Sequence, residues 1–445
     1  MRESVSSILI SGDEFFVIQR QNYLKAFPGY YSFPGGKVDK ADHEHAIDLE
    51  VEGVENYLLV SLRREVEEEL GIDIVELYKS GELLGISRCG TAITPDFNPH
   101  RFKNHYFKIF LKSKVDLIVD EGEAQKAFWI NAKNALELYK SGEMLVVPPM
   151  ISILDDLASN IGNKEAIDPN LKYNSSTEVP LIRPLGGVNQ FLPLSNTFPP
   201  ANRTNCFYIG DEDSVKVVID PSPKCLEEYE KLKYSLSQFK VDLIFLTHHH
   251  PDHHQFSTSL AKDLNIPMMM SADTEGRILQ KYGIDYFEGI SVKLAKDGEI
   301  LTTSCGQNVK ILETPGHDEG QLSLLRTDGA WAIVSDLIQT VGTVLVGDEE
   351  GDMNKYFASL RAVISLSPRT IFPSHGIGIG GTNKLEETLK HRLVREDQIH
   401  KLQNQGMGPE QMLLDIYPEL PARLHKYALL TINCHLKKIA DYGLN

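Results

Sequence analysis

Thr247-His-His-His-Pro-Asp-His-His254 holds five imidazoles and one carboxylate within eight residues, a density that packing alone does not require. The apolar run before it, Val241-Asp-Leu-Ile-Phe-Leu246, is typical of a buried strand. In open α/β sheets, ligands bind at the carboxyl ends of such strands. The sequence therefore predicts a ligand site at this strand end.

The spacing of these side chains predicts how they face. If the loop stays extended, alternate residues share one side, so His248, His250 and Asp252 would face one way and His253 another. Two groups of donors that face different ways predict two metal ions.

Three further candidates follow apolar runs downstream. His317 follows Val309–Glu313, while Asp336 and His375 end the runs that begin at Ala332 and Ile371. A His-rich tract can also be a loose surface feature, but these partners favour a built site. Imidazole nitrogen suits zinc, and carboxylates bridge metals or complete their coordination.

Together these residues resemble the metallo-β-lactamase fold of binuclear hydrolases. The resemblance rests on an H-x-H-x-D-H element followed, in order, by His317, Asp336 and His375. It implies an αββα sandwich in which Asp336 bridges two metals. It also implies the two ligand sets, which are His248, His250 and His317 for one metal and Asp252, His253 and His375 for the other. One departure is that His254-Gln-Phe256 stand where the family often has two glycines.

Such a centre predicts hydrolysis without a side-chain nucleophile. Two metals about 3.5–4 Å apart can share a water and lower its pKa, which gives a bridging hydroxide. Asp252 and Asp336 would orient this hydroxide and are therefore predicted to be catalytic. We expect two zinc ions, although iron and manganese also take such ligands.

The N-terminal part contains a glycine-rich loop, Phe33-Pro-Gly-Gly-Lys-Val38, and a helical pattern over Ser61–Gly71. In that helix Glu65, Glu68 and Glu69 share one face, where their repulsion would be relieved by a hard cation such as Mg²⁺. The alternative is a solvated acidic face paired with neighbouring arginines.

The segment Arg64-Glu-Val-Glu-Glu-Glu-Leu-Gly-Ile72 resembles the second half of the Nudix box, and the loop at Gly36 resembles the first half. Residues 40 to about 53 would be an insertion, as in the coenzyme A diphosphatase-like branch. The resemblance implies an α/β/α sandwich with Mg²⁺ or Mn²⁺ at the helix. It assigns metal binding and catalysis to Glu65, Glu68 and Glu69, cofactor contacts to Gly36 and Arg64, and a further carboxylate to Glu123.

The two resemblances, together with the linker-like composition of residues 155–178, imply a multidomain protein of mixed α/β and α+β class. The expected parts are a Nudix-like domain at 1–154, a linker at 155–178, a metallo-β-lactamase-like domain at 179–385 and a helical subdomain at 386–445. The last part resembles the winged-helix-like tail of β-lactamase-like endoribonucleases, through Arg395-Glu-Asp-Gln-Ile399 and His435-Leu-Lys-Lys-Ile439.

The formal charge of −17 disfavours non-specific binding to nucleic acid or to anionic membranes. Five scattered cysteines without CxxC spacing are typical of reduced thiols. No signal-peptide core or membrane-length apolar run is seen, so we expect a cytoplasmic protein with no membrane partner.

The substrate stays open between classes. A thioester, such as acyl-CoA or a glutathione thioester, is favoured by the resemblance to glyoxalase II-like and acyl-carrier thioesterase-like members. Single-stranded RNA is the rival, favoured by the tail. The Nudix part would hydrolyse or bind a nucleoside-diphosphate-linked compound, either as a second enzyme or as a binding module only. A homo-oligomer is compatible with the sequence.

Overall fold

The computed structural model describes residues 1–98, 101–347 and 349–442. The chain divides into two compact units, the first formed by residues 1–172 and 182–186 and the second by residues 173–181 and 187–445. Strand β7 (Leu181–Leu185) is shared between them. Among the described residues, no helix combines the length and the apolar character that a membrane crossing requires.

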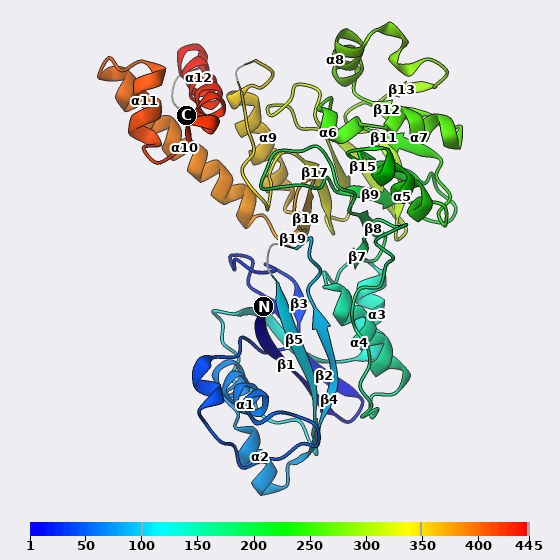
Figure 1. Cartoon of the computed structure of the whole chain (residues 1–445), viewed down its shortest axis with the longest axis vertical. Coiled ribbons are helices and arrows are strands. Elements are labelled where there is room, and N and C mark those ends of the chain that lie inside the picture. The colour runs from blue at the N-terminus through cyan, green and yellow to red at the C-terminus, as the bar shows by residue number, and fades with distance from the viewer. Residues whose placement is uncertain (99–100, 348, 443–445) are drawn as a thin grey trace. The chain divides into compact units, whose positions relative to one another are not determined.

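The first unit is built on a mixed six-stranded sheet of order β3-β2-β1-β5-β4, with β6 paired to β2 (Figure 1). Its strands are β1 Arg2–Ser11, β2 Glu14–Arg20, β3 Tyr31–Ser32, β4 Leu83–Ile93, β5 Phe102–Leu111 and β6 Ala124–Asn131. Its helices are η1 Lys40–His43, α1 Asn56–Leu70, α2 Ile74–Ser80, α3 Ala132–Lys140 and α4 Pro148–Ser159. β1 and β5 run parallel, whereas β1 and β2 form an antiparallel hairpin.

Alternation along β1 separates two cores on opposite faces of this sheet. Val5 and Leu9 pack with Leu62 and Val66 of α1 on one face, while Ile8 packs with residues of α3 and α4 on the other. Figure 1 shows α1 and α2 on one side of the sheet and α3 and α4 on the other. This is the α/β/α sandwich that the sequence predicted.

The second unit contains two sheets. One has the order β13-β12-β11-β10-β9-β8 and the other the order β14-β15-β16-β17-β18-β19. The strands of the first are β8 Val188–Phe191, β9 Cys206–Ile209, β10 Val217–Ile219, β11 Leu243–Phe245, β12 Met268–Met270 and β13 Val292–Leu294. Those of the second are β14 Ile300–Ser304, β15 Gln307–Glu313, β16 Leu322–Arg326, β17 Ala332–Ser335, β18 Thr370–Pro373 and β19 Ile379–Gly380.

Helices cover the outer faces of the two sheets, which gives the predicted αββα sandwich. The helices are α5 Leu226–Leu236, α6 Pro251–His254, α7 Ser257–Leu264, α8 Ala272–Tyr282, η2 Ile284–Phe287, α9 Met353–Leu366, α10 Asn383–Asn404, α11 Pro409–Ile416, η3 Ala422–Leu424 and α12 His425–Tyr442. Phe207 of β9 meets Phe372 of β18 at a ring distance of 5.7 Å between the sheets. Core residues from α5, α7 and α8 pack on the first sheet and those from α9, α10 and α12 on the second.

The structure adds detail at the expected domain boundaries, which stay predictions. Helix α4 continues to Ser159 inside the segment expected to be a linker, and Ile167 donates its N–H to the Cys89 carbonyl at 2.7 Å. Helix α10 begins at Asn383, just before the boundary expected at 385. The tail is helical as predicted, with α10, α11 and α12 around a small core of their own.

Candidate functional site

The histidine-rich segment lies where β11 ends and α6 begins. β11 is paired in parallel with β10 and β12, so its carboxyl end opens at the edge where ligands gather. Pro251 occupies the first turn of α6, a position that its fixed φ favours. Because the chain turns into this helix, Asp252 and His253 share a donor group with His375, whereas His250 belongs to another group with His248 and His317. The extended-loop prediction that placed Asp252 with His248 and His250 is therefore wrong.

One group of donors is formed by His248, His250 and His317, whose nitrogens lie within 4.8 Å of one another. His250 Nδ1 is 2.9 Å from His248 Nε2 and 3.0 Å from His317 Nε2. Asp252, His253 and His375 form a second group, in which one ligand atom from each residue lies within 4.8 Å of the other two.

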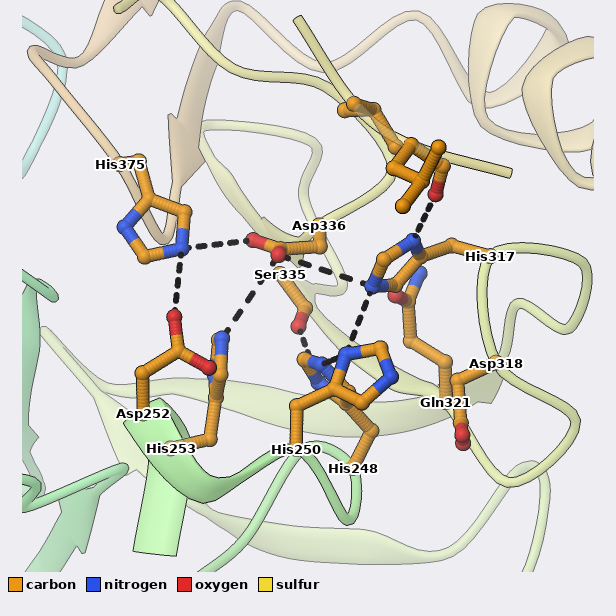
Figure 2. A network of polar contacts seen from close by, with 12 residues as sticks. His248, His250, Asp252, His253, His317, Asp318, Gln321, Ser335, Asp336 and His375 are labelled. Atoms are coloured by element: carbon orange, nitrogen blue, oxygen red, sulfur yellow. Dashed lines mark hydrogen bonds and ion pairs between the residues drawn. The ribbon is translucent and has the colours of Figure 1, made fainter. Parts of the chain in front are cut away.

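Asp336 lies between the two groups (Figure 2). Its Oδ1 is 3.4 Å from His375 Nε2, and its Oδ2 is 3.7 Å from Nε2 of both His253 and His317. The structure thus brings together the two sets and the central carboxylate that the resemblance implies. Their role as metal ligands stays a prediction.

Backbone and carboxylate acceptors orient three of the imidazoles. His317 Nδ1 lies 2.6 Å from the Leu345 carbonyl, His375 Nδ1 2.9 Å from the Arg203 carbonyl, and His253 Nδ1 2.8 Å from Asp220 Oδ2. Each acceptor requires the proton on Nδ1, which leaves the lone pair of Nε2 directed towards Asp336. This tautomer is the one that binds a metal through Nε2.

The buried polar atoms of this centre fit a divalent metal. His253 Nε2, His375 Nε2 and Asp336 Oδ1 are buried and have no hydrogen-bond partner among the described residues. Unpaired buried donors and acceptors are unfavourable and call for a partner. Burial alone would lower the pKa of His253, yet Asp220, Asp336 and Asp252 raise it well above its usual value. The carboxylates around His253 therefore favour positive charge at this ring, and the nitrogen and oxygen donors of the site suit zinc-like ions.

Asp220 is a site residue that the sequence analysis missed. It is 1% exposed, follows β10, and accepts hydrogen bonds from Thr247 N at 2.8 Å and Thr247 Oγ1 at 2.6 Å besides the one from His253. Its φ of 48° resembles that of Ser335, the residue before Asp336. The sequence does contain a signal for Asp220, because this carboxylate ends an apolar strand, and the same signal identified Asp336.

A second polar group, also missed, lies beside His250. His249 Nδ1 is 2.5 Å from Oδ2 of the fully buried Asp318, and Glu350 Oε2 is 2.9 Å from His250 Nε2. Burial opposes protonation of His249, but the nearby carboxylates of Asp318 and Glu350 raise its pKa to about 9. These carboxylates add negative charge next to the first group of donors.

The acidic helix of the first unit is α1. Glu69 accepts the N–H of Gly35 at 2.9 Å, and burial raises its pKa to about 7. Gly36 lies so close to Glu65 that a side chain there would meet the carboxylate at 2.2 Å. Glu68 is exposed, and Glu123 pairs with Arg20 at 3.5 Å. The glycine loop is thus fitted to the helix, although these glutamates are not among the close donor groups that the described residues form.

Arg64 lies among carboxylates. Its guanidinium pairs with Glu65 at 2.6 Å, Glu68 at 3.2 Å and Asp42 at 2.9 Å, and it also donates to the Lys37 carbonyl. Asp42 is 2% exposed and belongs to the segment expected to be an insertion. The insertion therefore packs its own carboxylate against the acidic helix.

Comparison with known families agrees with these two sites. Residues 1–145 match the NUDIX domain, and residues 199–375 match the Metallo-beta-lactamase superfamily. The chain therefore carries one domain of each, both from hydrolase families, and the predicted fold class is confirmed. The metallo-β-lactamase fold implies that the chain binds divalent metal.

The chain is 27% identical over 255 residues to the Beta-lactamase-like protein 2 homolog of Drosophila melanogaster. This match covers 54% of this chain and 83% of that protein. It is 26% identical over 223 residues to the atrochrysone carboxyl ACP thioesterase of Aspergillus fumigatus. That match covers 49% of this chain and 63% of the thioesterase. A β-lactamase domain protein from Burkholderia ambifaria shares the fold, with a TM-score of 0.52 at 16% identity over 61% of this chain and 90% of that chain.

The contacts of Asp220 generate a first prediction. We expect Asp220→Asn to weaken metal binding about 10- to 100-fold, because the variant loses the charged acceptor that fixes His253. We expect it to lower the free energy of unfolding by about 1–3 kcal/mol, since buried donors lose their partner. Chelator competition and thermal melting measure the two effects. Wild-type metal affinity in this variant would contradict the role given to Asp220.

Proposed function

We propose that the second unit is a binuclear metal-dependent hydrolase that cleaves a thioester, of acyl-CoA, glutathione or a carrier-protein type. The observation that carries this proposal is the pair of largely buried donor groups with Asp336 between them. The similarity to an ACP thioesterase supports the thioester as the bond that is cleaved.

The residues of the centre have separable roles in this proposal. His248, His250 and His317 would hold one metal, and Asp252, His253 and His375 the other, with Asp336 between them. Two bound metals would supply an activated water and stabilise negative charge on a carbonyl oxygen. Asp252 and Asp336 would orient that water, while Asp220 keeps His253 in the required tautomer.

The charge around the centre supports a thioester over RNA. Glu350 is about half exposed beside His250, and Asp318 lies behind His249. A polynucleotide would bring a phosphate charge per nucleotide towards these carboxylates, in a chain of net charge −17. A thioester presents an uncharged acyl group at the reacting carbon. RNA cleavage is the alternative that the assay must address.

We predict that His248→Ala and Asp336→Ala each lose bound metal and abolish thioester hydrolysis, because each removes a donor from the shared centre. Thiol release from acyl-CoA and from a glutathione thioester would be measured beside cleavage of single-stranded RNA, with metal content determined on the same samples. His391→Ala, exposed on α10, is the matched control and should behave as wild type.

The outcomes of this assay separate the candidates. Full activity with metal retained in His248→Ala or Asp336→Ala would reject the binuclear centre. If the wild type cleaves RNA and releases no thiol, and neither variant cleaves RNA, the binuclear centre stands and the proposed substrate changes from a thioester to RNA.

For the first unit we propose Mg²⁺- or Mn²⁺-dependent hydrolysis of a nucleoside-diphosphate-linked compound at Glu65, Glu68 and Glu69. The proposal is supported by the NUDIX match and by the close fit of Gly35 and Gly36 to Glu69 and Glu65. Oxygen donors on one helix face suit a hard cation that carries a diphosphate. A domain that only binds such a compound is the alternative.

We predict that Glu68→Gln removes metal-dependent pyrophosphate hydrolysis and leaves thiol release by the second unit unchanged. Glu68 is exposed, so its amide should not disturb folding. Glu67→Gln, exposed on the same helix, makes the same charge change as a control. Diphosphate cleavage would be followed with Mg²⁺ across nucleotide sugars, coenzyme A and dinucleotides. Unchanged cleavage in Glu68→Gln would reject the assigned site, and binding without cleavage by the wild type would favour the binding module.

A further inference from the structure

The segment that leads into α9 contacts two of the candidate ligands. The Leu345 carbonyl lies 2.6 Å from His317 Nδ1, and Glu350 Oε2 lies 2.9 Å from His250 Nε2. In each ring the other nitrogen faces the candidate ligands. His317 Nε2 and His250 Nδ1 lie 3.0 Å apart, so the segment contacts only the two outer nitrogens, His317 Nδ1 and His250 Nε2. One short segment thus orients two imidazoles of the same donor group.

Such outer acceptors influence a metal site in two ways. They fix the tautomer and the orientation of the ring, and they make the opposite nitrogen a better donor. Glu350 is about half exposed, so its position depends on how firmly its backbone is held.

The C-terminal helices hold this segment. Arg392 of α10, 6% exposed, donates to the Val344 carbonyl at 2.5 Å, next to Leu345. A side chain at Gly347 would lie 3.4 Å from Leu430 of α12, and Asp352 N donates to the carbonyl of Gly316, the residue before His317. The segment is therefore anchored on both sides of Glu350.

The two helices are themselves joined by a buried ionic group. Glu396 of α10 accepts from Lys438 Nζ at 2.8 Å, and its other oxygen is 3.3 Å from His435 Nδ1 of α12. All three side chains are at most 2% exposed. The tail motifs Arg395–Ile399 and His435–Ile439 therefore have a structural role, because Glu396 of the first pairs with His435 and Lys438 of the second inside the protein.

We propose that α10 and α12 serve the metal centre by holding residues 344–347 and 349–352 so that the Leu345 carbonyl and the Glu350 carboxylate orient His317 and His250. Arg392 and Glu350 are positioning residues in this arrangement. The inference rests on the metal centre proposed above, but it does not depend on the identity of the substrate.

The first test compares Glu350→Ala with Glu349→Ala, a variant of the adjacent exposed glutamate that makes the same charge change. Zinc affinity would be measured by chelator competition, and ligand geometry by the absorption spectrum of the cobalt-substituted protein. We expect Glu350→Ala to bind zinc about 10- to 100-fold more weakly and to shift the cobalt spectrum, Glu350→Gln to lie between it and wild type, and Glu349→Ala to match wild type. Wild-type affinity and spectrum in Glu350→Ala would overturn the role of this carboxylate.

The second test addresses the helices. Arg392→Met should weaken zinc binding and shift the cobalt spectrum while circular dichroism still shows a folded protein, and Arg392→Lys should restore part of the affinity. Folded Arg392→Met with wild-type affinity and spectrum would remove the C-terminal helices from the metal centre. Because neither readout uses a substrate, failure of thioester hydrolysis in the wild type would leave this test intact.

Discussion

The centre depends on the acceptors that hold three of its imidazoles, those of His253, His317 and His375, with Nε2 turned inward. Asp220 is the strongest of them, because a carboxylate with 1% exposure takes three donors, including His253 and both polar groups of Thr247. A charged group so deeply buried is stable only when its hydrogen bonds are complete. This requirement fixes the geometry of β10, β11 and α6 together, and with it the direction of the second donor group.

Much of this site could be predicted from the sequence, for a clear physical reason. His317, Asp336 and His375 each follow an apolar strand, and the carboxyl ends of neighbouring strands meet at one edge. The α/β/α layers of the first unit were implied by the Nudix resemblance, while the spacing of Leu62 and Val66 indicated the buried face of α1. Local periodicity indicates where these strands and helices bury their side chains, and the grouping of the ligands came from the family resemblance.

Other features depend on contacts between distant residues. The turn of α6 that carries Asp252 away from His250 could have been inferred from Pro251, but the extended-loop assumption hid it. No local sequence pattern indicates Glu350 or Arg392. Glu350 contacts His250, 100 positions away, and Arg392 binds the Val344 carbonyl, 48 positions away. Asp42 lies in an expected insertion, and only its partner Arg64 reveals why the insertion packs on the acidic helix.

The central claim is that two metals share one nitrogen- and oxygen-rich centre around Asp336. X-ray absorption at the edge of the metal that the purified protein carries tests it most directly. The account predicts a first shell of nitrogen and oxygen at about 2.0–2.2 Å with imidazole scattering, and a metal–metal vector of about 3.5–4 Å. A sulfur shell at about 2.3 Å, or a single metal without imidazole scattering, would contradict it.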